Sequence, residues 1–105
     1  MCPLALKDAL EHYKNRSVKA IMPVHLYGMP AKMDEIQQIA DEYNVPIIED
    51  AAEALGSKFK NQSCGTFGEM AALSFNGNKT VTSGGGGAIN LTTFLSVNGE
   101  PKPIE

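Results

Sequence analysis

The chain has no tryptophan, two cysteines and no long apolar run, and each shortage excludes a class of protein. Cys2 and Cys64 are too few and too far apart for a thiolate metal site or a disulfide framework, so we expect free thiols and no bound metal. No segment has the roughly 20 consecutive apolar residues of a membrane span, and residues 1–10 lack the apolar centre of a secretion signal. These features predict a cytoplasmic protein.

Positive charge is also scarce. Nine lysines and arginines face twelve acidic residues, which gives a net charge of −3. Without a basic patch, nucleic acid and anionic membranes are not expected as partners. A length of 105 residues allows one domain at most, and the 43% hydrophobic content is that of an ordinary globular protein.

Hydrophobic periodicity predicts alternating helices and strands in the first half of the chain. Apolar residues recur at helical spacing over 4–15 and again over 33–43, where acidic residues occupy the first turn. Continuous apolar stretches at 18–25 and 46–50 predict two buried strands. Strand, helix and strand in this order predict a right-handed βαβ unit with parallel strands.

The second half of the chain is richer in glycine and polar residues. We expect a strand at 70–75 and another around 88–91, with polar connections before them. The segment 92–105 shows no clear period, so we expect a loose tail there. Ligands of parallel sheets bind at the carboxyl ends of the strands, which is where His25 and Asp50 are expected.

Lys79 is the most informative single residue. Most lysines are solvated surface charges, but this one follows an apolar strand, stands in a loop of small residues and precedes the glycine run 84–87. That run fits either a flexible hinge or a close-approach turn into the next strand. A lysine placed beneath a cofactor can form a Schiff base with pyridoxal 5′-phosphate (PLP). We therefore predict Lys79 as the catalytic, PLP-bonding amine.

Three acidic residues near the end of the second strand have different interpretations. Asp50 fits either a helix N-cap or the carboxylate that keeps the PLP ring nitrogen protonated. Glu49 points the opposite way if the strand continues, so we interpret it as a bystander. Glu53 is either a surface acid or a group that reaches the phenolic oxygen of the ring or the substrate amine.

Ser74 and His25 also have both structural and functional interpretations. The hydroxyl of Ser74 either bonds a neighbouring carbonyl or takes the PLP phosphate. His25 at a strand end is more often a satisfied structural histidine than a catalytic base. A nucleotide P-loop around Lys79 is excluded, because Asn78 and Leu73 stand where that loop requires glycines.

Four ordered motifs carry a resemblance to a known family. They are Pro23-Val24-His25-Leu26-Tyr27-Gly28, Asp50-Ala51-Ala52-Glu53-Ala54-Leu55-Gly56, Gly65-Thr66-Phe67-Gly68 and Ser74-Phe75-Asn76-Gly77-Asn78-Lys79. Over about residues 1–89 the chain resembles the DegT/DnrJ/StrS family of fold-type I, PLP-dependent nucleotide-sugar aminotransferases. The resemblance implies an α/β fold, a partial three-layer sandwich with a mainly parallel sheet, as the central segment of the large domain.

The resemblance also implies roles, position by position. Lys79 matches the Schiff-base lysine, Asp50 the partner of the ring nitrogen and Ser74 a phosphate ligand. Glu53 stands where the family usually has Gln or His. That acidic variant is similar to the perosamine- and bacillosamine-type subgroup, which implies glutamate as donor, a nucleotide-linked 4-keto-6-deoxy sugar as acceptor and a homodimer.

The chain also departs from the family. We expect residues 1–91 to be part of the PLP-binding large domain and 92–105 to be a divergent tail, as in a truncated or frameshifted reading frame. The upstream phosphate-binding turn and the C-terminal domain of the family have no counterpart here, so we expect the isolated chain to be inactive. Two alternatives remain open: a non-catalytic fragment of such an enzyme, and a small nucleotide-binding α/β module.

Overall fold

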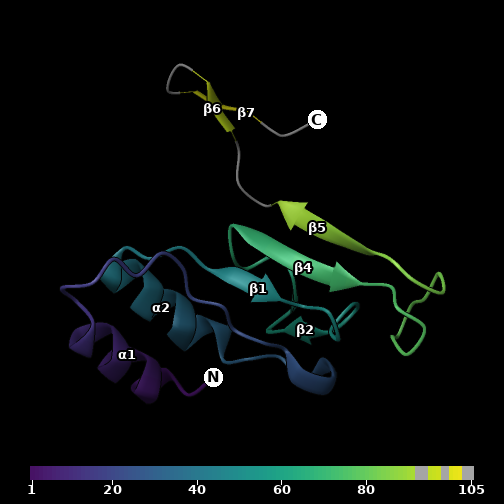
Figure 1. The fold of residues 1–105 in the computed structure, drawn as a ribbon, viewed down its shortest axis with the longest axis horizontal. Helices are drawn as coiled ribbons and strands as arrows, with labels where there is room; N and C mark the ends of the chain where they lie inside the picture. Colours follow the sequence, from purple (N-terminus) through teal and green to yellow (C-terminus); the bar gives the residue numbers. More distant parts are fainter. Residues whose placement is uncertain (92–94, 98–99, 103–105) are drawn as a thin grey trace.

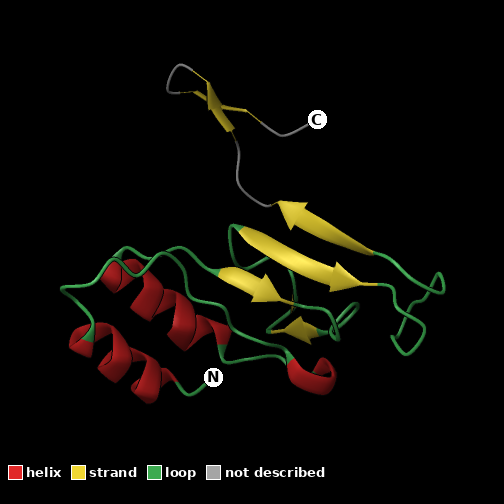
Figure 2. Cartoon of the chain, viewed as in Figure 1, coloured by secondary structure: helices red, strands yellow, loops and turns green. Residues whose placement is uncertain are grey.

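A computed structural model describes residues 1–91, 95–97 and 100–102 of the chain. Helices α1 and α2 lie side by side on one side of a small sheet (Figures 1 and 2). The elements, in chain order, are α1 (Pro3–His12), the 3-10 turn η1 (Leu26–Gly28), α2 (Met33–Tyr43), β1 (Ile48–Asp50), β2 (Lys58–Phe59), β3 (Gln62–Ser63), β4 (Met70–Ser74), β5 (Gly87–Leu91), β6 (Leu95–Val97) and β7 (Glu100–Lys102).

Helix α2 follows directly from the sequence pattern. Its buried residues, Met33, Ile36, Ile39 and Ala40, recur at the spacing of one helix face, and its first turn is acidic. Asn44 ends the helix in the left-handed conformation, with φ of 51°. The predicted helix over 33–43 is confirmed. Helix α1 ends at His12, three residues before the end of the predicted helix over 4–15.

The predicted strand over 18–25 is wrong as a continuous element, although its direction is right. The structure has isolated parallel bridges from Ile21 to Ile47 and from Val24 to Asp50. Ile21 N–H and His25 N–H donate to the carbonyls of residues 46 and 50, at 2.9 and 3.0 Å. The bond that would lie between these two is missing because Pro23 has no N–H to donate.

The three-stranded sheet has the order β1-β4-β5, with β1 parallel and β5 antiparallel to β4. The carboxyl ends of β1 and β4 lie at the same edge, and the connection over 75–86 leaves from that edge (Figure 1). This chain provides one helical layer and the sheet of the expected sandwich. The predicted fold class, a mainly parallel α/β segment, is confirmed by this arrangement and by the solved structures described below.

The two faces of the sheet differ in what covers them. Residues 47, 49 and 71 point to one face. On that face Ile21 and Ile47 join the main core with α1 and α2, whereas Glu49 and Ala71 lie against the loop 65–68. The opposite face is apolar and open to solvent. Its exposed members, identified by their register, are Met22, Val24, Met70, Ala72, Ile89 and Leu91. We call this set the open sheet face.

Two short hairpins lie outside this sheet. Strands β2 and β3 pair within the polar connection, and β6 pairs with β7. The predicted tail over 92–105 includes this second pair, and its other residues, 92–94, 98–99 and 103–105, lie outside the described part of the chain. The division into residues 1–91 and a divergent tail stays a prediction. No helix in the described residues is long and apolar enough to span a bilayer.

Candidate active site

Lys79 lies in the connection between β4 and β5, beyond the carboxyl end of β4. Its backbone N–H donates to Asn76 O at 3.0 Å, which closes a turn and leaves the side chain to fold back on the molecule. The Lys79 side chain is only 16% exposed. It lines a cavity of about 210 Å³ together with Tyr27, Glu53, Asn78 and Thr80. No helix begins after Lys79 in residues 80–91, so the structure agrees with the exclusion of a P-loop.

Glu53 is the direct partner of Lys79. Its Oε1 lies 3.4 Å from Lys79 Nζ, and its Oε2 accepts a hydrogen bond of 2.8 Å from the backbone N–H of Tyr27. The pKa of Glu53 is lowered, mainly by the hydrogen bond from Tyr27 N–H and to a smaller extent by Lys79. Glu53 is therefore a carboxylate with one oxygen fixed by the backbone and the other facing the amine.

Asp50 is the last residue of β1. Its Oδ1 accepts a hydrogen bond of 3.2 Å from Ala52 N–H, so the side chain caps a turn. Residues 51–57 are turns and irregular backbone, so Asp50 is not the cap of a helix. The interpretation of Asp50 as a helix N-cap is therefore wrong: Ala54 N–H bonds Ala51 O and Ser57 N–H bonds Ala54 O, which closes two successive four-residue turns and no helix.

Ser74 is the last residue of β4 and has a local contact. Its Oγ accepts a long hydrogen bond, 3.4 Å, from Asn76 N–H. Asp50 pairs with Ala72 in the sheet, and Ser74 lies two residues further along β4. Because side chains alternate along a strand, Asp50 and Ser74 point to the same face, at the same edge. That face is the open sheet face.

The glycine run has a precise packing role at one position. Gly87 pairs with Ser74 as β5 begins, and a Cβ at Gly87 would lie 2.7 Å from the carbonyl oxygen of Leu73. Gly84 and Gly86 have φ of 84° and 112°, which other residues rarely adopt. The run is therefore a close-approach turn into β5, as one of the two interpretations expected.

Glu49 and His25 have a larger structural role than the sequence indicated. Both side chains are fully buried, and His25 Nε2 lies 2.9 Å from Glu49 Oε2. Glu49 also accepts backbone N–H bonds from Gly65, Phe67 and Gly68, at 2.7, 2.5 and 2.7 Å. Burial opposes ionisation of this carboxyl, but His25 and the three amides outweigh it and lower the pKa of Glu49.

Glu49 does point away from Asp50, as predicted, but it is no bystander to the fold. It joins β1, the segment at His25 and the loop 65–68 through four hydrogen bonds. His25 accepts a hydrogen bond of 3.0 Å from Ala31 N–H at Nδ1, so both ring nitrogens are satisfied. A signal was present in the sequence: an acid inside an apolar strand needs donors if it is buried, and a nearby loop with two glycines offers backbone N–H groups.

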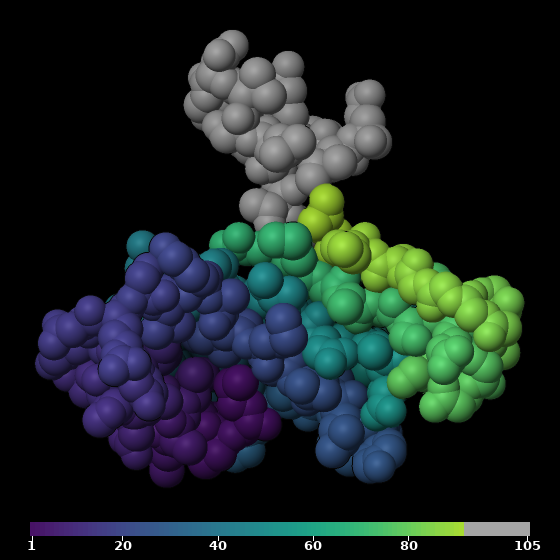
Figure 3. Space-filling model, viewed as in Figure 1, coloured from purple at the N-terminus to yellow at the C-terminus, as the bar shows by residue number. Residues whose placement is uncertain are grey.

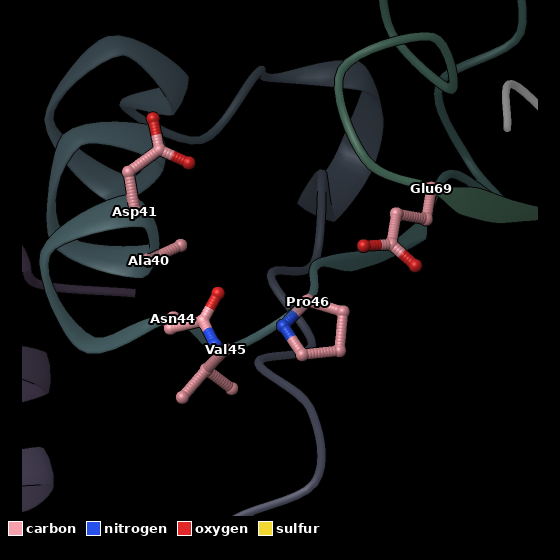
Figure 4. Close-up of a pocket in the computed structure, with 6 residues that line it drawn as sticks. All are labelled: Ala40, Asp41, Asn44, Val45, Pro46 and Glu69. Atoms are coloured by element: carbon pink, nitrogen blue, oxygen red, sulfur yellow. The ribbon is translucent and has the colours of Figure 1, made fainter. Parts of the chain in front are cut away.

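A separate hollow of about 210 Å³ lies away from Lys79 (Figure 4). Asp41 of α2 and Glu69, just before β4, lie on opposite sides of it, with Asn44 and Pro46 between. Among the described residues no group of three or more metal-ligating side chains lies together.

The thiol of Cys64 is buried. Burial raises the pKa of this thiol, which leaves it protonated at neutral pH.

In the space-filling view the connection that carries Lys79 lies at the opposite end of the molecule from α1 (Figure 3). Near the carboxyl edge of the sheet, the structure brings Glu53 and Lys79 into contact. It places Asp50 and Ser74 on one face of the sheet at the same edge. What sequence reasoning missed is Tyr27, whose backbone N–H fixes Glu53.

Comparison with known proteins gives this arrangement a family. The chain is 52% identical over 91 residues to EpsN of Bacillus subtilis strain 168, provisionally named a pyridoxal phosphate-dependent aminotransferase, covering 85% of this chain and 24% of EpsN. It is 46% identical over 86 residues to GDP-perosamine synthase of Escherichia coli O157:H7, covering 82% and 23%. The chain thus spans about a quarter of the length of these relatives.

Solved structures agree. The crystal structure of a DegT DnrJ EryC1 StrS aminotransferase from Brucella abortus matches with a TM-score of 0.81 and 38% identity, over 88% of this chain and 26% of that one. Aminotransferases of this family depend on PLP. Residues 1–93 match the sequence profile of the DegT/DnrJ/EryC1/StrS aminotransferase family, and the chain belongs to that family.

Proposed function

We propose that this chain supplies the cofactor-bonding segment of an enzyme that transfers an amino group from glutamate to a nucleotide-linked 4-keto-6-deoxy sugar. The observation that carries the proposal is the shielded amine of Lys79, 16% exposed and 3.4 Å from the Glu53 carboxylate, at the carboxyl edge of the sheet. The similarity to GDP-perosamine synthase supports the sugar class. A homodimer, a cytoplasmic location and a role in making cell-surface polysaccharide precursors belong to the same proposal.

The residues present fit the chemistry of PLP. Lys79 offers a primary amine that is largely withdrawn from water, as a lysine that bonds an aldehyde requires. Asp50 would hold a proton at the pyridine nitrogen, Ser74 would contact the phosphate, and Glu53 would lie toward the phenolic oxygen. Asp50 and Ser74 share one sheet face, as ligands of one cofactor should.

When bound, PLP draws electrons away from the reacting carbon and so makes its proton acidic. Lys79 would move that proton, because its Nζ lies at the cavity and its turn holds it there. Glu53 is a carboxylate at neutral pH, and the hydrogen bond from Tyr27 N–H and the contact with Lys79 lower its pKa further; its negative charge attracts the Lys79 side chain and keeps Nζ near the cavity. The backbone N–H of Tyr27 keeps Glu53 in that orientation.

A chimaeric subunit tests the proposal. Residues 1–89 would replace the matching segment of GDP-perosamine synthase from Escherichia coli, and the product would be assayed with glutamate and a nucleotide-linked 4-keto-6-deoxy sugar. We expect glutamate-dependent formation of an amino sugar, and loss of it in a Lys79→Ala chimaera. Equal activity in the Lys79→Ala chimaera would refute the role of the amine.

A second candidate function, a non-catalytic segment that retains the site residues, is supported by the open sheet face. That face exposes apolar side chains such as Ile89, which is 71% exposed, where a catalytic domain needs a covered sheet. The chimaeric subunit separates the two, because only the first candidate predicts turnover there. The 105-residue chain alone, mixed with PLP, glutamate and the sugar nucleotide, is a further check. We expect no turnover from the chain alone, and PLP-dependent formation of amino sugar would contradict this.

A further inference from the structure

His25 closes a loop that lies beside the candidate active site. Its Nδ1 accepts a hydrogen bond of 3.0 Å from Ala31 N–H, so the side chain of one loop end holds the backbone of the other. Since a backbone N–H can only donate, Nδ1 carries no proton, and the ring hydrogen must be on Nε2. We call residues 26–30 the capped loop.

Glu49 fixes the orientation of this imidazole. Its Oε2 accepts the Nε2 hydrogen of His25 at 2.9 Å, and both side chains are fully buried. A carboxylate that accepts the Nε2 hydrogen sets the tautomer that leaves Nδ1 free to accept. The remaining hydrogen bonds of Glu49 come from the loop 65–68, which holds the carboxylate rigidly.

The capped loop in turn holds Glu53. Tyr27 has φ of 52° and Gly28 has φ of 76°, two successive left-handed residues that a chain rarely adopts without outside restraint. In this conformation Tyr27 N–H donates to Glu53 Oε2 at 2.8 Å, and Gly28 O accepts a 2.8 Å bond from Ser57 Oγ. Tyr27 is 86% exposed, so packing of its own side chain does not impose the strained backbone.

We propose that His25 is a positioning residue for Lys79: it holds the capped loop in the strained conformation whose Tyr27 N–H aims Glu53 at the lysine amine. The path runs from His25 to Ala31, through the loop to Glu53, and across 3.4 Å to Lys79 Nζ. Its value for catalysis rests on the proposed function, but the path itself is a property of the chain.

Two variants of His25 separate its contacts. In His25→Asn the amide oxygen can replace Nδ1 as the acceptor for Ala31 N–H. In His25→Gln the amide can reach Glu49 but not Ala31. The measurement is the rate at which an amine-reactive reagent, acetic anhydride, modifies Lys79 in the 105-residue chain, relative to the exposed Lys19 of the same molecules, by peptide mapping.

We expect His25→Gln to raise the relative rate at Lys79 about two- to fivefold, as the loss of one partly exposed ion pair would do. Glu53→Gln should give the same rise, and His25→Asn should stay near the original rate. The proposed role of His25 is overturned if His25→Gln leaves the modification rate of Lys79 unchanged while Glu53→Gln raises that rate. It is equally overturned if His25→Asn raises the rate as much as His25→Gln does, since the effect would then be general loosening.

Amide hydrogen exchange of the unaltered chain gives an independent test if the His25 variants do not fold. Ala31 N–H, bonded to a buried ring, should exchange far more slowly than exposed loop amides. Glu53→Gln should speed exchange at Tyr27 and leave Ala31 protected. Fast exchange at Ala31 in the unaltered chain would refute the closure. None of these readouts needs cofactor or substrate, so they stand or fall separately from the proposed function.

Discussion

Replacing Glu49 by glutamine should destabilise this chain more than any other change of a single acidic side chain to its amide. Each carboxylate oxygen of Glu49 accepts two hydrogen bonds: Oε1 from Phe67 and Gly68, and Oε2 from Gly65 and His25. A glutamine has one acceptor oxygen, so its NH₂ group must face two donors. Breaking a buried charged network in this way costs about 3–5 kcal/mol.

That cost is a large part of the total, because a domain of this size is stabilised by about 5–15 kcal/mol. Urea unfolding followed by far-ultraviolet circular dichroism measures the difference in free energy of unfolding. Glu35→Gln is the matched control, because Glu35 is exposed and its ion pair with Lys32 is 3.5 Å long. The control should change stability by less than about 1 kcal/mol. A Glu49→Gln chain within 1 kcal/mol of the original would refute the network's importance.

The pH dependence of the same difference gives a further check. The pKa of Glu49 is lowered from its ordinary value of 4.5, so the folded chain binds the proton more weakly than the unfolded chain does. The stability that ionised Glu49 contributes is therefore fully present above about pH 5 and is lost as the pH falls through the folded pKa. The gap between the original chain and Glu49→Gln should narrow in acid. A gap that widens below pH 4.5 would contradict the assigned direction.

Three further predictions concern packing, chemistry and association. A Cβ at Gly68 would lie 2.5 Å from a backbone carbonyl oxygen, so Gly68→Ala should lower the free energy of unfolding in urea by about 1–3 kcal/mol. The control Gly85→Ala, with open space around the residue, should be nearly neutral. In the chimaeric subunit, Asp50→Asn should keep PLP absorbance but lower transamination by about two orders of magnitude or more, and unchanged turnover would refute its role. The isolated chain should self-associate through its open sheet face, so Ile89→Thr should reduce association in sedimentation velocity while Leu4→Ala, an exposed residue on α1, should not.

The parts of the fold that follow local rules could be predicted from the sequence. Helix α2 has an apolar stripe, an acidic first turn and a left-handed Asn44, and each acts within a few residues. The strand before it was only half predictable. Its apolar composition indicated a strand, but Pro23 removes one donor from the ladder and leaves only isolated bridges.

The sequence predicts candidate site residues, whose roles stay predictions, but it does not predict the contacts between them. Lys79 and Glu53 were expected to act through the cofactor, and the structure pairs them directly. Glu49 was interpreted as a bystander because strand alternation gives a direction and not a partner. Its donors are 16 to 24 residues away in the chain, so only tertiary structure brings them to it. The left-handed conformation of Tyr27 likewise goes with a tertiary contact, the hydrogen bond from its N–H to Glu53, and no local pattern in the sequence predicts that contact.

The most direct test of the account is chemical trapping of the cofactor in the chimaeric subunit. Borohydride reduction of the PLP-loaded protein, followed by peptide mapping, locates the lysine that bonds the cofactor. We expect a pyridoxyl group on Lys79, whose side chain is shielded and adjoins the cavity at the carboxyl edge of the sheet. A pyridoxyl group on Lys58 or Lys60, with Lys79 unmodified, would contradict the central claim.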